Sequence, residues 1–109
     1  MKKFLWKPSD TRREFSLLED FSKFINFKSN HNFKDFWKWS VDHPEEFWSK
    51  FWDYSKIIGD KGKEIIKYNK TFNQTKFFPD SKLNYAENIL KKKTTEIAIS
   101  FLSEKGFEE

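Results

Sequence analysis

The chain has 109 residues and a net charge of +4; 20% of its residues are aromatic, 35% are charged and none is cysteine. This length accommodates one ordinary domain. The lack of cysteine excludes disulfides, thiolate zinc sites and thiol catalysis. No apolar run approaches the roughly 20 residues that cross a bilayer. No signal peptide is expected either, because the opening MKKFLWKPSD has no apolar segment. We therefore expect a cytoplasmic protein without a membrane partner.

The positive charge is carried mostly by lysine. Nineteen of the 21 basic residues are lysines, they are spread among 17 acidic residues, and their only run is Lys91-Lys92-Lys93. A nucleic-acid-binding protein would instead gather its basic residues on one face. The pattern favours an ordinary solvated exterior, and we expect no nucleic-acid partner.

The first part of the chain predicts an arm and a helix. Residues 1–10 are expected to be extended, with Trp6 as an apolar anchor. The helix start stays open, because Thr11 with Glu14 and Ser16 with Glu19 both have the spacing of a capping box. The helix should end by residues 29–30. Its predicted apolar stripe is Leu17, Leu18, Phe21, Phe24 and Ile25. Its predicted outer residues are Glu19, Asp20, Ser22 and Lys23.

Residues 33–54 hold four of the five tryptophans. Their spacing predicts two amphipathic helices that meet at a corner near Asp42 and His43. Pro44 suits the first turn of the second helix, and the acids that follow it suit the helix dipole. The rings could also form a stacking platform for bases, but their core-like spacing on helices favours burial. The two predicted core stripes are Phe33, Phe36, Trp37 and Val41, then Phe47, Trp48, Phe51 and Trp52.

The next segment carries fewer large apolar residues. Residues 59–62 are predicted to be a loop, and residues 63–76 to be irregular apart from a short strand or turn at Ile65-Ile66. Residues 77–80 (FFPD) are expected to form a second aromatic anchor in extended conformation. Residues 83–90 have helical spacing, with one apolar face that consists of Leu83, Ala86, Ile89 and Leu90.

The last segment changes to the periodicity of a strand. Residues 97–102 are mostly apolar, which predicts a β-strand covered on both faces, followed by a turn at 103–106. A lone strand cannot satisfy its own hydrogen bonds. We expect its partner to lie upstream in the chain or to be missing from it.

The sequence predicts no catalytic, cofactor-binding or metal-binding residue. The glycines at 59, 62 and 106 do not form a phosphate loop. His31 and His43 lack companion ligands, so a solvent-facing or capping role is favoured for each. Glu87, which lies between two asparagines, is interpreted as a helix-surface residue. Neither Ser40 nor Ser81 is assigned a catalytic role, and a histidine that activates either serine would have to be its spatial neighbour.

Several phrases together resemble the N-terminal region of AMP-forming acyl-CoA synthetases, and within them the acetoacetyl-CoA synthetase branch. The phrase at 83–88, Leu-Asn-Tyr-Ala-Glu-Asn, carries the similarity to that branch. Phe77 and Asp80 depart from the family pattern, in which many members have Trp and Gly. The phrases are WKPS at 6–9, WSVDHP at 39–44, FW at 47–48, WD at 52–53, FFP at 77–79 and LNYAENIL at 83–90.

The resemblance implies a two-step acid–thiol ligase. A carboxylate attacks ATP to give an acyl-adenylate, which coenzyme A captures as a thioester. ATP, Mg and CoA are thus implied for the full-length enzyme and none of them for this chain. The family's phosphate loop, its Tyr-Arg-x-Gly-Asp motif and its C-terminal catalytic lysine do not occur here, so this chain alone is expected to be inactive.

We therefore expect an α+β fold, mainly α with a small β part. Residues 1–93 would form a helical cap, and residues 94–109 would begin the ATP-binding catalytic domain, the chain's partner. Rings that are surplus to a small core, Trp39 above all, should then be exposed for that domain. The alternative is a free-standing helical protein-interaction module without enzymatic activity.

Overall fold

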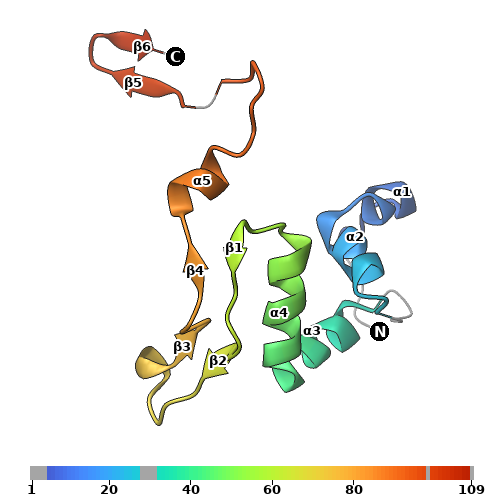
Figure 1. Ribbon diagram of the computed structural model, residues 1–109. Helices are drawn as coiled ribbons and strands as arrows, with labels where there is room; N and C mark the ends of the chain where they lie inside the picture. The colour runs from blue at the N-terminus through green and yellow to red at the C-terminus, as the bar shows by residue number, and fades with distance from the viewer. Residues whose placement is uncertain (1–4, 28–31, 98, 109) are drawn as a thin grey trace.

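The computed structural model describes residues 5–27, 32–97 and 99–108. It combines helices with short antiparallel strand pairs, which confirms the predicted α+β class (Figure 1). The helical elements are α1 (Asp10–Glu14), α2 (Leu17–Phe24), α3 (Phe33–Asp42), α4 (Pro44–Tyr54), the 3-10 helix η1 (Phe72–Gln74) and α5 (Tyr85–Ile89). The strands are β1 (Gly59–Asp60), β2 (Ile66–Lys67), β3 (Lys76–Phe77), β4 (Lys82–Leu83), β5 (Phe101–Ser103) and β6 (Gly106–Glu108).

The first helical segment is two helices, which resolves the ambiguous start. Ser9 caps α1 by accepting a hydrogen bond from the Arg12 amide, and Ser16 caps α2 through the Glu19 amide. The predicted Ser16 start is therefore confirmed. The Thr11 start is wrong, because the N-cap of the first helix is Ser9, two residues earlier. The α2 helix ends before the predicted limit, and Asn26 follows it in the left-handed region at φ 54°.

The predicted corner between the two Trp-rich helices is confirmed. His43 is at once the last cap of α3 and the first cap of α4, and Pro44 opens α4. Asn32 caps the start of α3 by accepting from the Lys34 amide. The corner and the Pro44 start were predicted from the sequence, whereas the Asn32 cap was not.

The core is a small ring cluster centred on Phe21 of α2. The Phe21 ring is 4% exposed and lies 5.9 Å from the rings of Phe36 and Phe47, 5.6 Å from Phe51 and 5.0 Å from Tyr54, all measured between ring centroids. Three of these four contacts are edge-to-face, the arrangement that aromatic quadrupoles favour. The cluster joins α2, α3 and α4.

Most of the predicted core stripes are not buried. Only Phe21, Phe36 and Trp52 of those stripes are buried, together with Ile66 of β2. A cluster of three short helices covers only the side of each helix that faces its neighbours, so wide stripes remain partly open. The stripe residues that stay exposed are Leu17, Leu18, Phe24, Phe33, Trp37, Val41, Trp48 and Phe51.

Two further expectations for single residues are wrong. Ser22, placed on the outer face, is buried, and its hydroxyl donates to the Phe27 carbonyl at 3.5 Å. Trp39, expected to be exposed, is half-buried and packs against Phe27 at 5.3 Å and Phe47 at 5.9 Å. The loop after α2 folds back and supplies Phe27, which the helical pattern did not anticipate.

The middle of the chain forms two small antiparallel ladders. In one, β1 pairs with β4, with Gly59 opposite Leu83; in the other, β2 pairs with β3, with Ile66 opposite Phe77. The predicted strand or turn at Ile65-Ile66 is therefore confirmed. Residues 77–80 are not extended throughout, because Phe78 has φ 48° and turns the chain away from β3.

The predicted helix over 83–90 is shorter, since Leu83 belongs to β4 and the α5 helix spans Tyr85–Ile89. The predicted strand 97–102 is also displaced. It forms only at β5 and pairs with β6, which follows it, so its partner lies neither upstream nor outside the chain. The expected cover on both faces is absent here, because Ile99 and Leu102 are 77% and 72% exposed. Ala98 lies outside the described residues.

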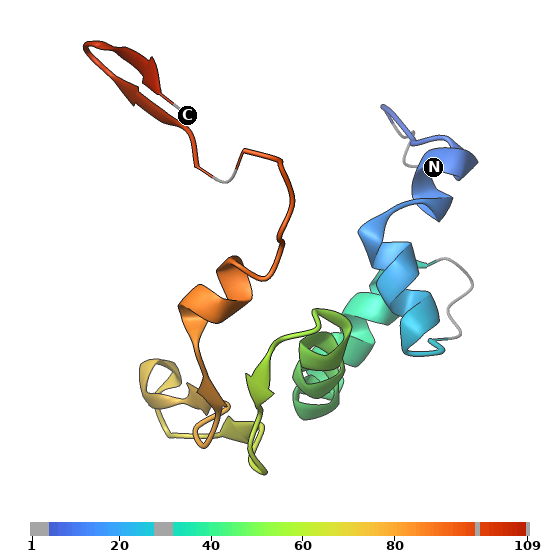
Figure 2. The same cartoon turned by 45° about the horizontal axis from the view of Figure 1, so that its top comes forward.

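The chain is elongated (Figure 2). Its radius of gyration is 19.0 Å, whereas a compact domain of this length has about 13 Å. Its accessible surface is 10318 Å², against roughly 6,500 Å² for a compact monomer of this mass. In both views the β5–β6 hairpin lies at one end, away from the helices. None of the described helices has the length and apolar character to span a membrane.

Candidate functional site

The residues weighed as chemical groups in the sequence lie on separate elements, except for Ser40 and His43, which are three residues apart at the end of α3. His43 is exposed at the corner between α3 and α4, the Ser40 hydroxyl donates to the Trp37 carbonyl at 2.7 Å, and Glu87 lies exposed on α5. The Ser81 amide donates to the Phe78 carbonyl at 3.1 Å. His31 lies outside the described residues. In the part of the chain that the structure describes, His, Cys, Asp and Glu side chains do not gather in threes around a possible metal position.

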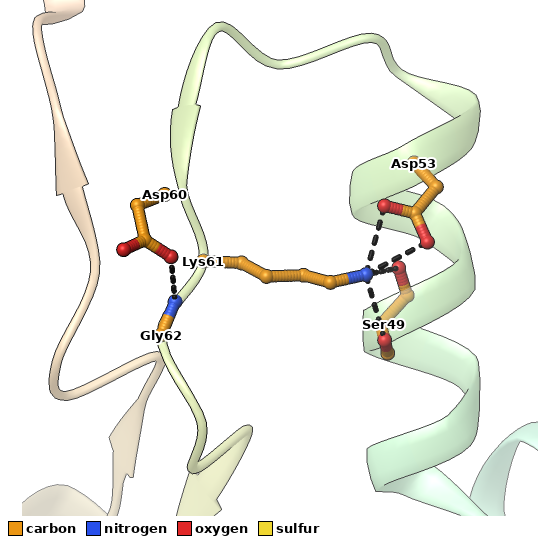
Figure 3. Close-up of polar contacts among 5 residues, drawn as sticks. All are labelled: Ser49, Asp53, Asp60, Lys61 and Gly62. Carbon is orange, nitrogen blue, oxygen red and sulfur yellow. Dashed lines mark hydrogen bonds and ion pairs between the residues drawn. The ribbon is translucent and has the colours of Figure 1, made fainter.

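The most connected polar group is the ammonium of Lys61, in the loop after β1 (Figure 3). Its Nζ donates to Asp53 Oδ1 at 2.8 Å and Oδ2 at 2.7 Å, to Ser49 Oγ at 3.1 Å and to the Ser49 carbonyl at 3.4 Å. An ammonium has three N–H groups. Lys61 thus has more acceptors on α4 than protons to donate. Its ammonium ties the loop after β1 to α4 and is not a free acid or base.

Two local features hold the Lys61 loop in place. The Asp60 carboxylate accepts from the Gly62 amide at 2.8 Å, as Figure 3 shows. Gly62 has φ 75°, and a Cβ there would lie 2.9 Å from the Cβ of Asp80. Glycine is the residue that tolerates both the left-handed backbone and this close approach. The loop geometry therefore aims Lys61 at α4.

The α5 helix is fastened to the same region by Asn88. Its side-chain amide donates to the Ile58 carbonyl at 2.9 Å, and its oxygen accepts from the Ile58 amide at 2.8 Å. Lys91 donates to the carbonyls of Ser55 and Lys56, both at 3.3 Å. These carbonyls follow the end of α4, where backbone acceptors lack helical partners. Asn84 caps α5 through the Glu87 amide.

Aromatic contacts join α4 to the segment around β3. The Trp52 ring lies 4.8 Å from Phe78, and the Trp48 ring lies 5.5 Å from Phe77. The rings of α4 thus have two sets of neighbours. Trp48 and Trp52 contact Phe77 and Phe78, whereas Phe47 and Phe51 contact Phe21 of α2. We call this assembly the α4 junction; it comprises Ser49, Trp52, Asp53, Lys61, Phe78 and Asn88.

The α4 junction therefore brings residues of several phrases into one region of the fold, although Trp52 and Asn88 are 36 residues apart in the sequence. Sequence reasoning identified Trp52-Asp53, Phe77-Phe78 and Asn88 through the resemblance. It missed Ser49 and Lys61. No local signal pointed to Lys61, because its carboxylate partner lies on a different element.

A second polar contact ties α2 to α4. The Tyr54 hydroxyl donates to Asp20 Oδ2 at 2.9 Å and lies 3.4 Å from the Leu17 carbonyl. The hydrogen bond to Asp20, followed by burial and by the negative charge of Asp20, raises the pKa of Tyr54 above its ordinary value of 10.0. This contact supports the ring cluster from its polar side.

Residues 33–89 match the sequence model of the family described as acetyl-coenzyme A synthetase N-terminus. The chain belongs to this family. The matched range contains α3, α4, α5 and every residue of the α4 junction. The resemblance inferred from the phrases is confirmed.

Several curated relatives of the chain are acetoacetyl-CoA synthetases. The chain is 31% identical to acetoacetyl-coenzyme A synthetase of Rhizobium meliloti (strain 1021), over 92% of the chain and 16% of the relative. It is 35% identical to acetoacetyl-CoA synthetase of Gallus gallus, over 72% of the chain and 12% of the relative, and 32% identical to that of Danio rerio, over 98% and 16%. The chain therefore spans less than a fifth of these relatives' length. No solved structure matches it significantly.

Proposed function

We propose that this chain is a non-catalytic, structural N-terminal region of an acid–thiol ligase of the acetoacetyl-CoA synthetase type. The complete enzyme activates a carboxylate with ATP and transfers the acyl group to coenzyme A. ATP, Mg and CoA are assigned to that complete enzyme and to no residue of this chain. The match of residues 33–89 to the synthetase N-terminus carries the proposal.

The contacts of the family phrases support a structural role. At the α4 junction, Asp53 neutralises Lys61 and Asn88 holds the backbone of Ile58. Among the described residues no acidic or basic side chain is buried. Catalytic acids and bases are usually tuned by burial or by an unsatisfied charge neighbour. The side chains of Asp53 and Asn88 in the phrases thus hold elements of the fold together.

We further propose the division of the chain that the sequence suggested. Residues 1–93 act as the helical cap, and residues 94–109 begin the ATP-binding catalytic domain, which is the partner of the cap. The separate position of the β5–β6 hairpin supports this boundary. The same proposal includes a cytoplasmic location for the enzyme. The free-standing interaction module is not favoured, because the relatives are all ligases.

The test is a chimera. In the Rhizobium meliloti synthetase, the segment that matches this chain is replaced by residues 1–109. We expect acetoacetate-dependent release of AMP and formation of the CoA thioester, and no such activity for residues 1–109 alone.

Matched variants locate the effect at the α4 junction. The double variant Trp52→Ala/Lys61→Ala should lower the activity of the chimera, because it removes both the Trp52–Phe78 ring contact and the Lys61–Asp53 ion pair. Phe72→Ala, at an 86% exposed ring, should not lower it. Pyrophosphate exchange into ATP by residues 1–109 alone would contradict the proposal, as would a folded chimera without activity.

A further inference from the structure

The α3 helix has three faces rather than two. Phe36 and Trp39 pack inward, 5.6 Å apart and in contact with Phe27. A polar face consists of Lys34, Asp35, Lys38 and Asp42, and an ion pair joins its Lys38 and Asp42. The third face is an apolar stripe at i, i+4 and i+8, which consists of Phe33, Trp37 and Val41.

The third face is open in this chain. Phe33 is 64% exposed, Trp37 57% and Val41 56%. The helix already has a polar face for solvent and inward rings for the core, so neither the core nor solubility requires the apolar stripe. Phe33 also borders a small cavity of about 140 Å³ between α2 and α3, together with Leu18, which is 44% exposed. We define Leu18, Phe33, Trp37 and Val41 as the outer stripe.

The amount of exposed surface indicates what covers the outer stripe. The chain exposes about 3,800 Å² more than a compact monomer of its mass. A standard dimer covers only about 800 Å² on each partner. A second copy of this chain would therefore leave most of the excess open. The chain is also 54 Å long in its longest dimension, so a partner that covers it must be large.

We propose that the outer stripe docks on the catalytic body of an acid–thiol ligase, the part of the relatives that this chain does not span. This inference rests on the proposed function and adds the surface through which the cap binds. The inward rings of α3 hold the cap together, and the outer stripe holds the cap to the enzyme. Such burial of apolar side chains is the usual source of stability at permanent interfaces.

The test compares two triple variants in two contexts. Phe33→Ser/Trp37→Ser/Val41→Ser removes most of the outer stripe, and Lys34→Ser/Asp35→Ser/Lys38→Ser is the control on the polar face of the same helix. Each is made in residues 1–109 alone and in the Rhizobium chimera. The readout is the rate of tryptic cleavage after Lys50 of α4, which reports how often the cap opens and does not depend on ligase activity.

We expect cleavage after Lys50 to be at least about tenfold slower in the parent chimera than in the isolated chain. The stripe variant should abolish this protection, and the control should keep it. In the isolated chain, the stripe variant should leave the circular dichroism spectrum and the cleavage rate unchanged, because the stripe is exposed there.

Three results would overturn the inference. One is a stripe variant that is protected as well as the control in the chimera. Another is the loss of helical structure in the isolated stripe variant, which would assign the stripe to the internal core. The third is a stripe-dependent dimer of the isolated chain in sedimentation, which would assign the stripe to a second copy. A protected but inactive chimera would count against the proposed function and would support the docking surface.

Discussion

Single polar residues of the family phrases hold the backbone where helices and turns end. Asn84 and Asn88 do this for α5 and for Ile58. Lys61, which lies outside the phrases, ties the loop after β1 to the Asp53 side chain of α4. Each interaction satisfies a backbone group or a charge that would otherwise lack a partner. Their importance for the fold does not require any of them to react with a substrate.

The hydrogen bond from the Tyr54 hydroxyl to Asp20 makes the stability of the fold depend on pH. The pKa of Tyr54 is raised, chiefly by the hydrogen bond to Asp20, so the folded chain favours the protonated form more than the unfolded chain does. The stabilisation is therefore complete below pH 10.0 and is lost as the pH rises through the higher pKa of the folded state. We expect Tyr54→Phe to remove the latest-ionising phenol from a phenolate absorbance titration. A titration without a late component in the parent chain would contradict this.

Lys61 should stabilise the chain through its carboxylate and serine partners. Lys61→Met keeps the aliphatic stem and removes the ammonium, which leaves Asp53 without its cation. Because both groups are partly exposed, we expect a loss of about 1 kcal/mol in the free energy of unfolding. Urea unfolding followed by circular dichroism measures this loss. Lys63→Met, at an exposed lysine two residues along, is the control and should be near neutral.

At the scale of elements, the sequence predicted what local rules decide. The periodicity of α2, α3 and α4, the Ser16 cap and the Pro44 start were all visible. The strands were less predictable, because β1 and β4 are two residues long and are defined by partners more than 20 residues away (59 and 83). The sequence also did not show which side of each helix is buried, since this depends on the neighbours that pack against the helix. Ser22 and Trp39 were misplaced for that reason.

The attachment of α5 to the end of α4 depends on one amide. Asn88→Ala removes both hydrogen bonds to Ile58 and should let α5 separate from the loop before β1. We expect the Ile58 amide to exchange its hydrogen faster by about tenfold, which corresponds to the roughly 1–1.5 kcal/mol that such a bond contributes. Hydrogen exchange observed by NMR measures this directly. Asn73→Ala, in the exposed η1 turn, should leave the Ile58 rate unchanged.

The whole molecule was the least predictable level. Counting rings suggested a core that buries two complete aromatic stripes, whereas four apolar side chains are buried among the described residues. Burial requires neighbours on every side, and an elongated chain of this length provides few. The α4 helix packs against Phe21 on one side and against Phe78 on another, which is why Trp52 is buried while Trp37 is exposed.

The elongated shape is a measurable property of the whole chain. In small-angle X-ray scattering, monomeric residues 1–109 should give a radius of gyration near 19.0 Å. A collapsed domain would give about 13 Å, and a fully unfolded chain of this length would give about 33 Å by the scaling that holds for denatured proteins. A value near 13 Å would show that the hairpin and the outer stripe of α3 are covered within the chain itself. That outcome would remove the need for a large partner and, with it, the physical basis for docking on a ligase body.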